Sequence, residues 1–455
     1  MSISSKILVR GAAWTTGAYV VTQAVRLGTN VVLARLLAPE LFGTMLIVDT
    51  LRIGIELISD VGIFQNIIYH DNADDPAFYN TAWTLQLFRS LILSAVFLAA
   101  AVPIARFYES PIFASIFPIS ALSFIITGLS SIKRPLAQKR LEVIKLNIFD
   151  MLITCISSAS FIVFAYITPT IWALVFGGFA PSIASTIGSY FLLSGVKQRL
   201  YISKPAARQI LAFGKWIFLS SIVFFLSMNY DRLYLAKVIP FELVGVYGIS
   251  RAISDVSTNL VARLANMIVF PFIAAHTNMS RADLRGQLKP IRLKSMILAA
   301  LGFSIFVVAA DLAIKVLYDK RYHDATWVLP VLLVGSWFSI LANVNESTLL
   351  GVGKPSYGAM ASGARFGFLV VALWIAAGNY GFIGCVLVIA ASDVCRYVPS
   401  LLGQVREGCS FALQDLLCTL VVFSMIALLE WIRWFFGFGT SFETLPVNWQ
   451  DFRLM

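Results

Sequence analysis

Charged side chains are scarce in this sequence. Asp, Glu, Lys and Arg make up 13% of its 455 residues, whereas apolar residues make up 58%. Soluble domains carry roughly 25% charged residues, because their surface has to interact with water. A chain of this length with so little charge is not a soluble protein, and its apolar surplus must face lipid. Since a membrane helix needs about 20 residues, the apolar content is enough for about a dozen spans.

Histidine and cysteine are also rare, with 3 and 5 residues. The cysteines lie in or beside apolar segments without CxxC spacing, so we expect reduced thiols and neither disulfides nor a metal site. The histidines stand alone in separate connections and form no metal cluster or acid–base pair: His70, His276 and His323. No GxxxxGK[ST] nucleotide motif is present. These absences argue against an enzyme and against a cofactor.

Apolar stretches of spanning length recur along the chain. We predict twelve spans at about 11–35, 41–68, 80–105, 112–132, 146–168, 171–194, 210–236, 242–274, 293–317, 325–350, 357–377 and 380–402. A further stretch, 411–436, is long enough to cross, but Asp415, Glu430 and Arg433 interrupt it. It either spans the membrane or lies at the interface, and the side of the C-terminus depends on which.

Basic residues gather in alternate connections. These connections share a side with Lys6 and Arg10, so the positive-inside rule predicts a cytoplasmic N-terminus. With no aromatic interleaving or folded module, the basic loops do not indicate nucleic-acid binding. The residues are Lys133, Arg134, Lys139, Arg140, Lys145, Lys197, Arg199, Lys204, Arg208, Arg281, Arg285, Lys289, Arg292 and Lys294.

The sequence contains an internal repeat. LARLLAPELFG at 33–43 returns as LAKVIPFELVG at 235–245, each time between two apolar spans. Six predicted spans separate the copies, and an even number preserves orientation, so the repeats are parallel. We therefore expect an all-α polytopic membrane protein with two six-helix lobes, 1–200 and 201–405, around a central cavity, followed by an extension, 406–455, with one more hydrophobic helix.

Ionisable residues inside the spans are the best indicators of a site, because they are costly in lipid and normally face a cavity or pair with one another. On the second span four of them fall on one helix face, and on the eighth span a similar stripe includes Arg251 and Asp255. The predicted substrate-binding residues are Arg26, Arg52, Arg251, Arg365 and Arg396. The predicted cation-coupling or ion-pair residues are Asp49, Glu56, Asp60, Asp231 and Asp255. An excess of arginine suits an anionic substrate.

Several short motifs resemble, in order, those of the polysaccharide transport family of the MOP flippase superfamily, which includes the Wzx-type flippases. They are Gly11-Ala-Ala-Trp14, LARLLAPELFG, Asp60-Val-Gly62, TAWTLQLFRS at 81–90, IARFYESP at 104–111, MNYDRLYLAKVIPFELVGVYGISRAI at 228–253, FPFIAA at 270–275 and GVGKPS at 351–356. The resemblance implies a two-lobed bundle with a cation-lined lumen. It also implies that Asp231 either couples transport to a cation or pairs with Arg232.

The expected function is to flip an undecaprenyl-diphosphate-linked oligosaccharide across the bacterial inner membrane for exopolysaccharide, capsule or O-antigen (lipopolysaccharide) synthesis. Its expected partners are that anionic lipid-linked oligosaccharide, membrane lipids, a polysaccharide polymerase and a chain-length regulator. Two alternatives stay open. One is an exporter of the same fold for the peptidoglycan lipid precursor or a drug, and the other is a membrane polymerase or ligase, which the short external connections disfavour.

Overall fold

The computed structural model describes residues 5–60, 62–69, 74–275 and 279–446, and the regular elements in these ranges are all helices. The all-α fold predicted from the sequence is confirmed. The chain divides into two compact units, residues 1–225 and 226–455, with the division inside helix α10 (Lys204–Val238). The predicted lobes 1–200 and 201–405 and the extension 406–455 rest on the repeat and stay a prediction.

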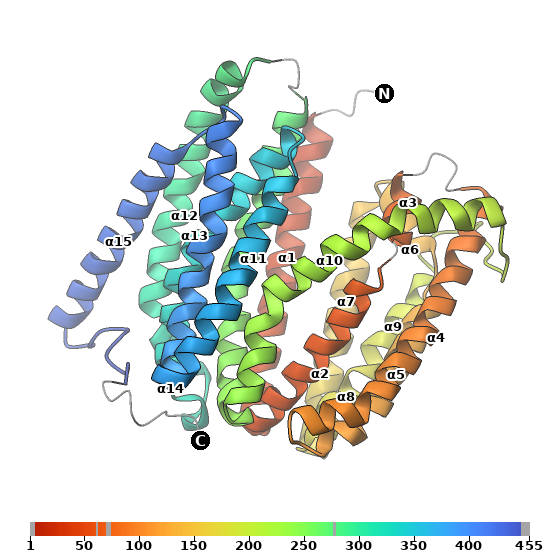
Figure 1. The fold of residues 1–455 in the computed structure, drawn as a ribbon, viewed down its shortest axis with the longest axis horizontal. Helices are drawn as coiled ribbons and strands as arrows, with labels where there is room; N and C mark the ends of the chain where they lie inside the picture. Colours follow the sequence, from red (N-terminus) through yellow and green to blue (C-terminus); the bar gives the residue numbers. More distant parts are fainter. Residues whose placement is uncertain (1–4, 61, 70–73, 276–278, 447–455) are drawn as a thin grey trace. The chain divides into compact units, whose positions relative to one another are not determined.

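The N-terminal unit is built from nine helices and the first part of α10. Figure 1 shows α4 packed along α5, and α1 lies against α7, which also contacts α8 and α9. The bounds are α1 (Ser5–Leu36), α2 (Pro39–Ile58), α3 (Ile63–Tyr69), α4 (Pro76–Phe107), α5 (Ile112–Gly128), α6 (Lys133–Lys139), α7 (Val143–Ile167), α8 (Ile171–Gly177) and α9 (Phe179–Ser189).

Two stretches predicted as single spans are broken in this unit. The stretch 41–68 is interrupted between α2 and α3, where Gly62 has a φ of 65° and donates its N–H to the Asp60 carboxylate at 2.9 Å. Glycine adopts this left-handed conformation without the steric cost that a side chain would add. The stretch 112–132 becomes α5 followed by α6 at an angle of 52°. Hydropathy was continuous across both stretches, so it did not reveal the breaks.

The C-terminal unit centres on α13 (Ala325–Gly351), which is buried along most of its length and packs against α11 (Phe241–Ala275), α12 (Arg281–Leu317) and α14 (Ser356–Arg406). Helix α14 contains both predicted spans 357–377 and 380–402. They meet at Gly381, whose φ of 58° and ψ of −145° are outside the helical region. Only glycine populates that region readily, so α14 changes direction there without a loop.

Helix α15 (Ala412–Phe435) packs along α12 in the same unit. Arg292, predicted as a topology-setting residue in a cytoplasmic connection, instead lies inside α12 with 3% of its surface exposed. Its guanidinium forms an ion pair with Asp415 of α15, with 2.5 Å between Nη2 and Oδ1. The prediction for Arg292 was wrong because a charge close to the end of an apolar run looks the same whether it faces water or a buried partner.

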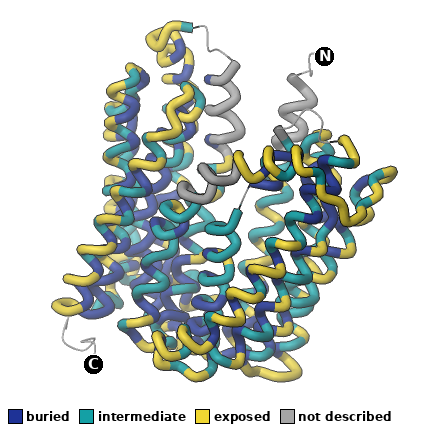
Figure 2. The backbone as a smooth tube through the Cα atoms, turned by 45° about the vertical axis from the view of Figure 1, so that its right-hand side comes forward, coloured by how far each residue is buried: buried dark blue, intermediate teal, exposed yellow. Residues whose placement is uncertain are grey.

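Many helices expose apolar side chains along their length. In Figure 2 exposed positions run along the helices as well as at their ends, and Leu298 and Trp374 are each 73% exposed. Among the described residues, seven helices are long and apolar enough to cross a membrane, or eight if the bent pair of α5 and α6 counts as one span. Helix α2 is not in this set because Glu40, Asp49, Arg52 and Glu56 fall within its 20 residues. A multi-pass membrane protein fits both observations.

Candidate functional site

The predicted polar face of α2 is present in the N-terminal unit. The Arg52 guanidinium lies 3.3 Å from the Asp49 carboxylate and 3.8 Å from that of Glu56. These are pairs at spacings of three and four residues, where helical side chains meet. The structure therefore pairs Asp49 with Arg52, and the roles predicted for them in substrate binding and cation coupling stay predictions. All three side chains stay partly accessible, with 29 to 42% of each exposed, so they can still interact with a ligand.

Arg52 and Glu56 line a cavity of about 540 Å³ inside the N-terminal unit. Its wall also contains two more arginines, an aspartate and a glutamine, with hydroxyl groups from the ends of α5 and α9, and Phe64 and Phe124 on its apolar side. The volume is in the range of roughly 300–1,000 Å³ that is usual for small-molecule sites. The other polar lining residues are Asp60, Gln86, Arg89, Ser90, Thr127, Ser130, Ser131, Arg134, Ser185 and Ser189.

Arg89 of α4 has a structural role in this cavity wall. It donates to the backbone carbonyl oxygens of Glu56 at 2.5 Å and Ser59 at 2.9 Å, and to the Ser59 hydroxyl. These carbonyls belong to the last turn of α2 and the residue after it, where the helix leaves acceptors unsatisfied and carries partial negative charge. Arg89 therefore holds the end of α2 against α4. Arg134 is paired with Asp150 at 2.9 Å, and both side chains are about half exposed.

A second group of charges lies inside the C-terminal unit, on α10 and α11. Arg232 pairs with Asp255 at 3.0 Å, and Arg251 lies 3.2 Å from the same carboxylate. Arg251 and Asp255 are thus paired, and their predicted roles in substrate binding and coupling stay predictions. Asp231 is fully buried and accepts a hydrogen bond from the Tyr247 hydroxyl, so its direct partner is the phenol and not Arg232.

Arg365 and Asp393 of α14 are both 1% exposed and lie 3.4 Å apart. Arg365 also donates to the Ser392 hydroxyl at 3.2 Å. Within the described part of the chain, neither Asp231 Oδ1 nor Arg365 Nη2 has a hydrogen-bonding partner, although both atoms are buried. A buried polar atom without a partner costs about 1–3 kcal/mol, so its presence calls for an explanation such as a bound water, ion or proton.

Arg396 is also paired. It binds both carboxylate oxygens of Glu346, at 3.1 and 2.8 Å, and the Asn343 side-chain oxygen at 2.8 Å, which joins α14 to α13. Glu346 was missed in the sequence, although a carboxylate within the apolar stretch 325–350 was the signal that could have revealed it. The structure thus brings Arg251, Arg365 and Arg396 into buried ion pairs, and their predicted contact with substrate stays a prediction.

Arg26 differs from the other predicted arginines. It lies on α1, is exposed, and makes no ion pair or hydrogen bond to any residue in the described ranges. The five cysteines are free thiols. His70 and His276 lie outside the described residues, and among those described no group of His, Cys, Asp and Glu is arranged to hold a metal.

The side chains that line the N-terminal cavity suit a ligand that combines anionic and hydroxyl groups. Guanidinium groups bind phosphate oxygens, while carboxylate, amide and hydroxyl side chains exchange hydrogen bonds with sugar hydroxyls. The C-terminal charges are neutralised within their own unit, and Asp231, Arg365 and Asp393 are buried. They suit an internal network better than a ligand surface in this conformation.

Comparisons with known proteins agree with the fold and the motifs. A family model described as "Polysaccharide biosynthesis protein" matches residues 32–326. The chain is 24% identical over 275 residues to the lipopolysaccharide biosynthesis protein WzxC of Escherichia coli K12, covering 60% of this chain and 56% of WzxC. It is 19% identical over 392 residues to the succinoglycan biosynthesis transport protein ExoT of Rhizobium meliloti, covering 83% and 79%. The aligned region is thus just over half the length of WzxC.

Among solved structures, the lipid II flippase MurJ in an inward closed conformation is similar, with a TM-score of 0.70 and 12% identity over 95% of this chain and 94% of MurJ. This likeness establishes the fold, and the polytopic all-α fold predicted from the sequence is confirmed. The predicted resemblance to the polysaccharide transport family is confirmed by the family model and by the relatives WzxC and ExoT. Because the family model covers well over half of the chain, the protein belongs to the polysaccharide biosynthesis protein family.

Proposed function

We propose that this protein moves an undecaprenyl-diphosphate-linked oligosaccharide across the bacterial inner membrane, for exopolysaccharide, capsule or O-antigen synthesis. The observation that carries the proposal is the cavity lined by Arg52, Arg89 and Arg134 inside a membrane unit of a family member. A cavity of this size lined by several guanidinium groups favours an anionic head group with attached sugars. A simple lipid would need no such polar lining.

In this proposal Arg52 contacts the diphosphate. Its partners Asp49 and Glu56 are on the same helix and partly exposed, so Arg52 can turn from them to phosphate without leaving a buried charge unpaired. Glu56 and Asp60 accept hydrogen bonds from sugar hydroxyls, and the cavity serines either donate to them or accept from them. Four further arginines join the substrate path when the protein changes conformation: Arg26, which is exposed, and Arg251, Arg365 and Arg396.

The same proposal assigns coupling to the buried network of the C-terminal unit. Asp231 holds an unpartnered oxygen beside Tyr247, and its nearest cationic neighbours include Arg251 and Arg365. Gain or loss of a proton or a small cation at this carboxylate would change the charge balance of the network. Asp255, shared by two arginines, would transmit that change along α11. Asp231 and Asp255 are thus the proposed coupling residues.

The N-terminus is proposed to be cytoplasmic, and the substrate to enter from the cytoplasmic leaflet and leave on the other side by alternating access. A polymerase and a chain-length regulator would take the product. ExoT is named as a transport protein, which favours transport over a polymerase or ligase reaction. The MurJ fold keeps one alternative, the peptidoglycan lipid precursor, which has the same diphosphate chemistry. An arginine-lined cavity disfavours the binding of a cationic drug.

Complementation tests the substrate and the role of Arg52 together. The intact chain is expressed in strains that lack their own oligosaccharide flippase or their own peptidoglycan-precursor flippase, and surface polysaccharide or growth is measured. We expect rescue of the first strain by the wild-type protein, loss of rescue with Arg52→Gln, and partial rescue with Arg52→Lys, because lysine keeps the charge but not the bidentate geometry.

Arg321→Gln is the matched control. Arg321 is also an arginine held by an aspartate, Asp319, at 2.5 Å, but it belongs to the connection after α12 and does not line the cavity. This variant should rescue like the wild type. Rescue of only the second strain would assign the peptidoglycan precursor as substrate. Failure to rescue either strain, with the protein present in the membrane, would refute the proposal.

A further inference from the structure

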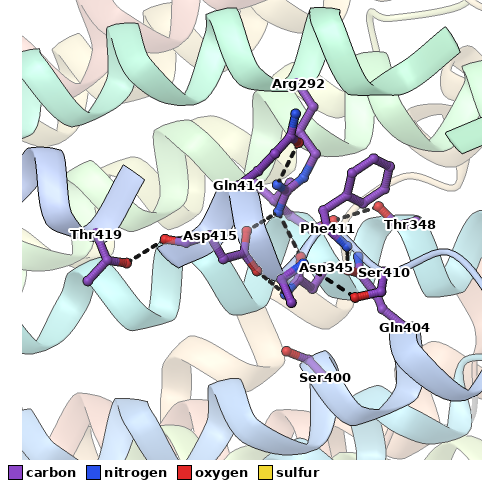
Figure 3. A network of polar contacts seen from close by, with 12 residues as sticks. Arg292, Asn345, Thr348, Ser400, Gln404, Ser410, Phe411, Gln414, Asp415 and Thr419 are labelled. Carbon is purple, nitrogen blue, oxygen red and sulfur yellow. Dashed lines mark hydrogen bonds and ion pairs between the residues drawn. The ribbon is translucent and has the colours of Figure 1, made fainter. Parts of the chain in front are cut away.

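The polar contacts between α12 and α15 determine the direction in which α15 runs and the distance that it covers. Near the beginning of both, Arg292 of α12 reaches Asp415 of α15 at 2.5 Å, and the two side chains are 2% and 1% exposed. Figure 3 shows this pair enclosed by polar side chains, with Asn345 bonded to both and Gln414 accepting from Arg292. Tyr397 of α14 donates to the same carboxylate at 3.1 Å. The start of α15 is thus fixed to three other helices.

A second ion pair joins the far ends of the same two helices. The Arg433 guanidinium of α15 binds both carboxylate oxygens of Asp311 on α12, at 2.8 and 3.1 Å. Asp311 is 1% exposed and is also bound by Lys315 at 3.0 Å. A bidentate arginine–carboxylate pair with a buried partner is among the stronger polar contacts in proteins. We call these two ion pairs, Arg292–Asp415 and Asp311–Arg433, the clamps.

The clamps fix the direction and length of α15. The earlier residue of α12, Arg292, pairs with the earlier residue of α15, and the later residue, Asp311, pairs with the later one, so α15 runs parallel to α12. At 1.5 Å per residue the two clamps are roughly 28 Å apart on either helix. This is close to the thickness of about 30 Å of the bilayer hydrocarbon core. A helix lying flat at one interface could not keep both clamps with a partner that crosses the membrane.

The segment after α15 provides an independent observation. Within residues 437–446, Ser441 donates its backbone N–H to Glu430 of α15 at 3.0 Å, and the Thr444 hydroxyl lies 3.0 Å from that of Thr326. Thr326 belongs to the first turn of α13, directly after the connection that follows α12. Residues 437–446 therefore lie at the same end of the unit as the α12–α13 connection.

The same end of α15 carries a cluster of exposed aromatic rings. Their exposed fractions lie between 58 and 68%, so more than half of each side chain is left uncovered by the described part of the chain. Tryptophan is enriched at the membrane–water interface, where one end of the ring system is apolar and the N–H can reach water. The cluster is formed by Trp431, Trp434, Phe435, Phe436 and Phe438.

We propose that α15 is a complete additional membrane crossing, parallel to α12, that inserts its aromatic cluster among the lipid head groups of the leaflet opposite to the start of α12. Residues 437–446 then lie on the extracytoplasmic side with the α12–α13 connection. Asp415 and Arg433, which interrupt the apolar stretch 411–436 in the sequence, are the residues that attach the helix to its neighbour. Their charge is therefore no argument against a span.

Single-cysteine labelling with a membrane-impermeant maleimide tests this in cells that express the full chain, with the five native cysteines replaced by alanine. Three exposed positions are compared: Glu443→Cys after α15, Lys320→Cys in the α12–α13 connection and Arg285→Cys near the start of α12. We expect Glu443→Cys to label in intact cells to the same extent as Lys320→Cys. Arg285→Cys should label only after the membrane is permeabilised.

Labelling of Glu443→Cys together with Arg285→Cys would place both ends of α15 on one side and overturn the proposal. If the cysteine-free background does not fold, the wild-type chain is fused at its C-terminus to alkaline phosphatase or to green fluorescent protein. An active phosphatase and a dark fluorescent protein support a complete crossing, and the reverse result refutes it. Neither readout depends on the transported substrate, so the outcome is independent of the proposed function.

Discussion

At the scale of single residues, the charges of this protein fall into two kinds. Some remain partly exposed beside the cavity of the N-terminal unit, as Arg52 and Glu56 do. Others, such as Arg365 and Asp393, are withdrawn from solvent and neutralise each other inside the C-terminal unit. The first kind can exchange a protein partner for a ligand at little cost. The second cannot do so in the conformation described, because a buried ion without its counter-ion is strongly destabilised.

The Arg292–Asp415 clamp gives a sharp prediction about stability. Asp415→Asn leaves the Arg292 guanidinium buried without a counter-ion, so we expect the free energy of unfolding to fall by about 3–5 kcal/mol. Thermal unfolding in detergent measures this. Exchange of the two residues, Arg292→Asp with Asp415→Arg, should recover part of the loss, because the pair is restored with reversed direction. An unchanged melting temperature for Asp415→Asn would show that the clamp does not stabilise the fold.

The ion pairs also show which residue contacts can be predicted from sequence. Asp49–Arg52 and Arg251–Asp255 are three and four residues apart, so helical geometry alone brings them together. The partners Arg292 and Asp415 are 123 positions apart, and only the tertiary packing of α12 and α15 joins them. The arginines of the candidate site could therefore be found as misplaced charges, but their burial and their partners on other helices could not.

At the scale of elements, the apolar runs predict where helices lie because lipid requires about 20 apolar residues per crossing. They do not predict every break. The stretch 41–68 was predicted without the interruption at Gly62, whereas the boundary predicted between 377 and 380 lies next to Gly381, where α14 changes direction. Both positions depend on backbone conformations that hydropathy does not report.

The contact between α13 and α14 also depends on a glycine. A Cβ atom on Gly335 would lie 2.4 Å from the backbone oxygen of Ala390, so Gly335→Ala would force the two helices apart. We expect a loss of about 1–3 kcal/mol in the free energy of unfolding. Gly367→Ala on α14 is the control, because nothing lies within 4 Å of its Cβ position and alanine favours helix by about 1 kcal/mol. Equal melting temperatures for the two variants would contradict the close approach.

At the scale of the whole molecule, the distribution of basic residues makes a prediction that is separate from the substrate. The connection with Lys133, Arg134 and Arg140 should be cytoplasmic, and the one between α7 and α8 extracytoplasmic. Gln138→Cys should therefore react with an impermeant maleimide only after permeabilisation, while Thr170→Cys should react in intact cells. The opposite pattern would invert the orientation proposed for the N-terminus and for the direction of transport.

The clamps between α12 and α15 have a further consequence for the membrane. Two helices joined at both ends can neither slide along each other nor tilt independently, so together they present a hydrophobic belt of fixed height. When such a belt meets a bilayer with longer or shorter acyl chains, the lipid has to stretch or compress around it, at a cost of a fraction of a kcal/mol for each Å of mismatch. We therefore expect the helix pair to fit bilayers of one thickness best, because of four charged side chains that are almost entirely withdrawn from the surface.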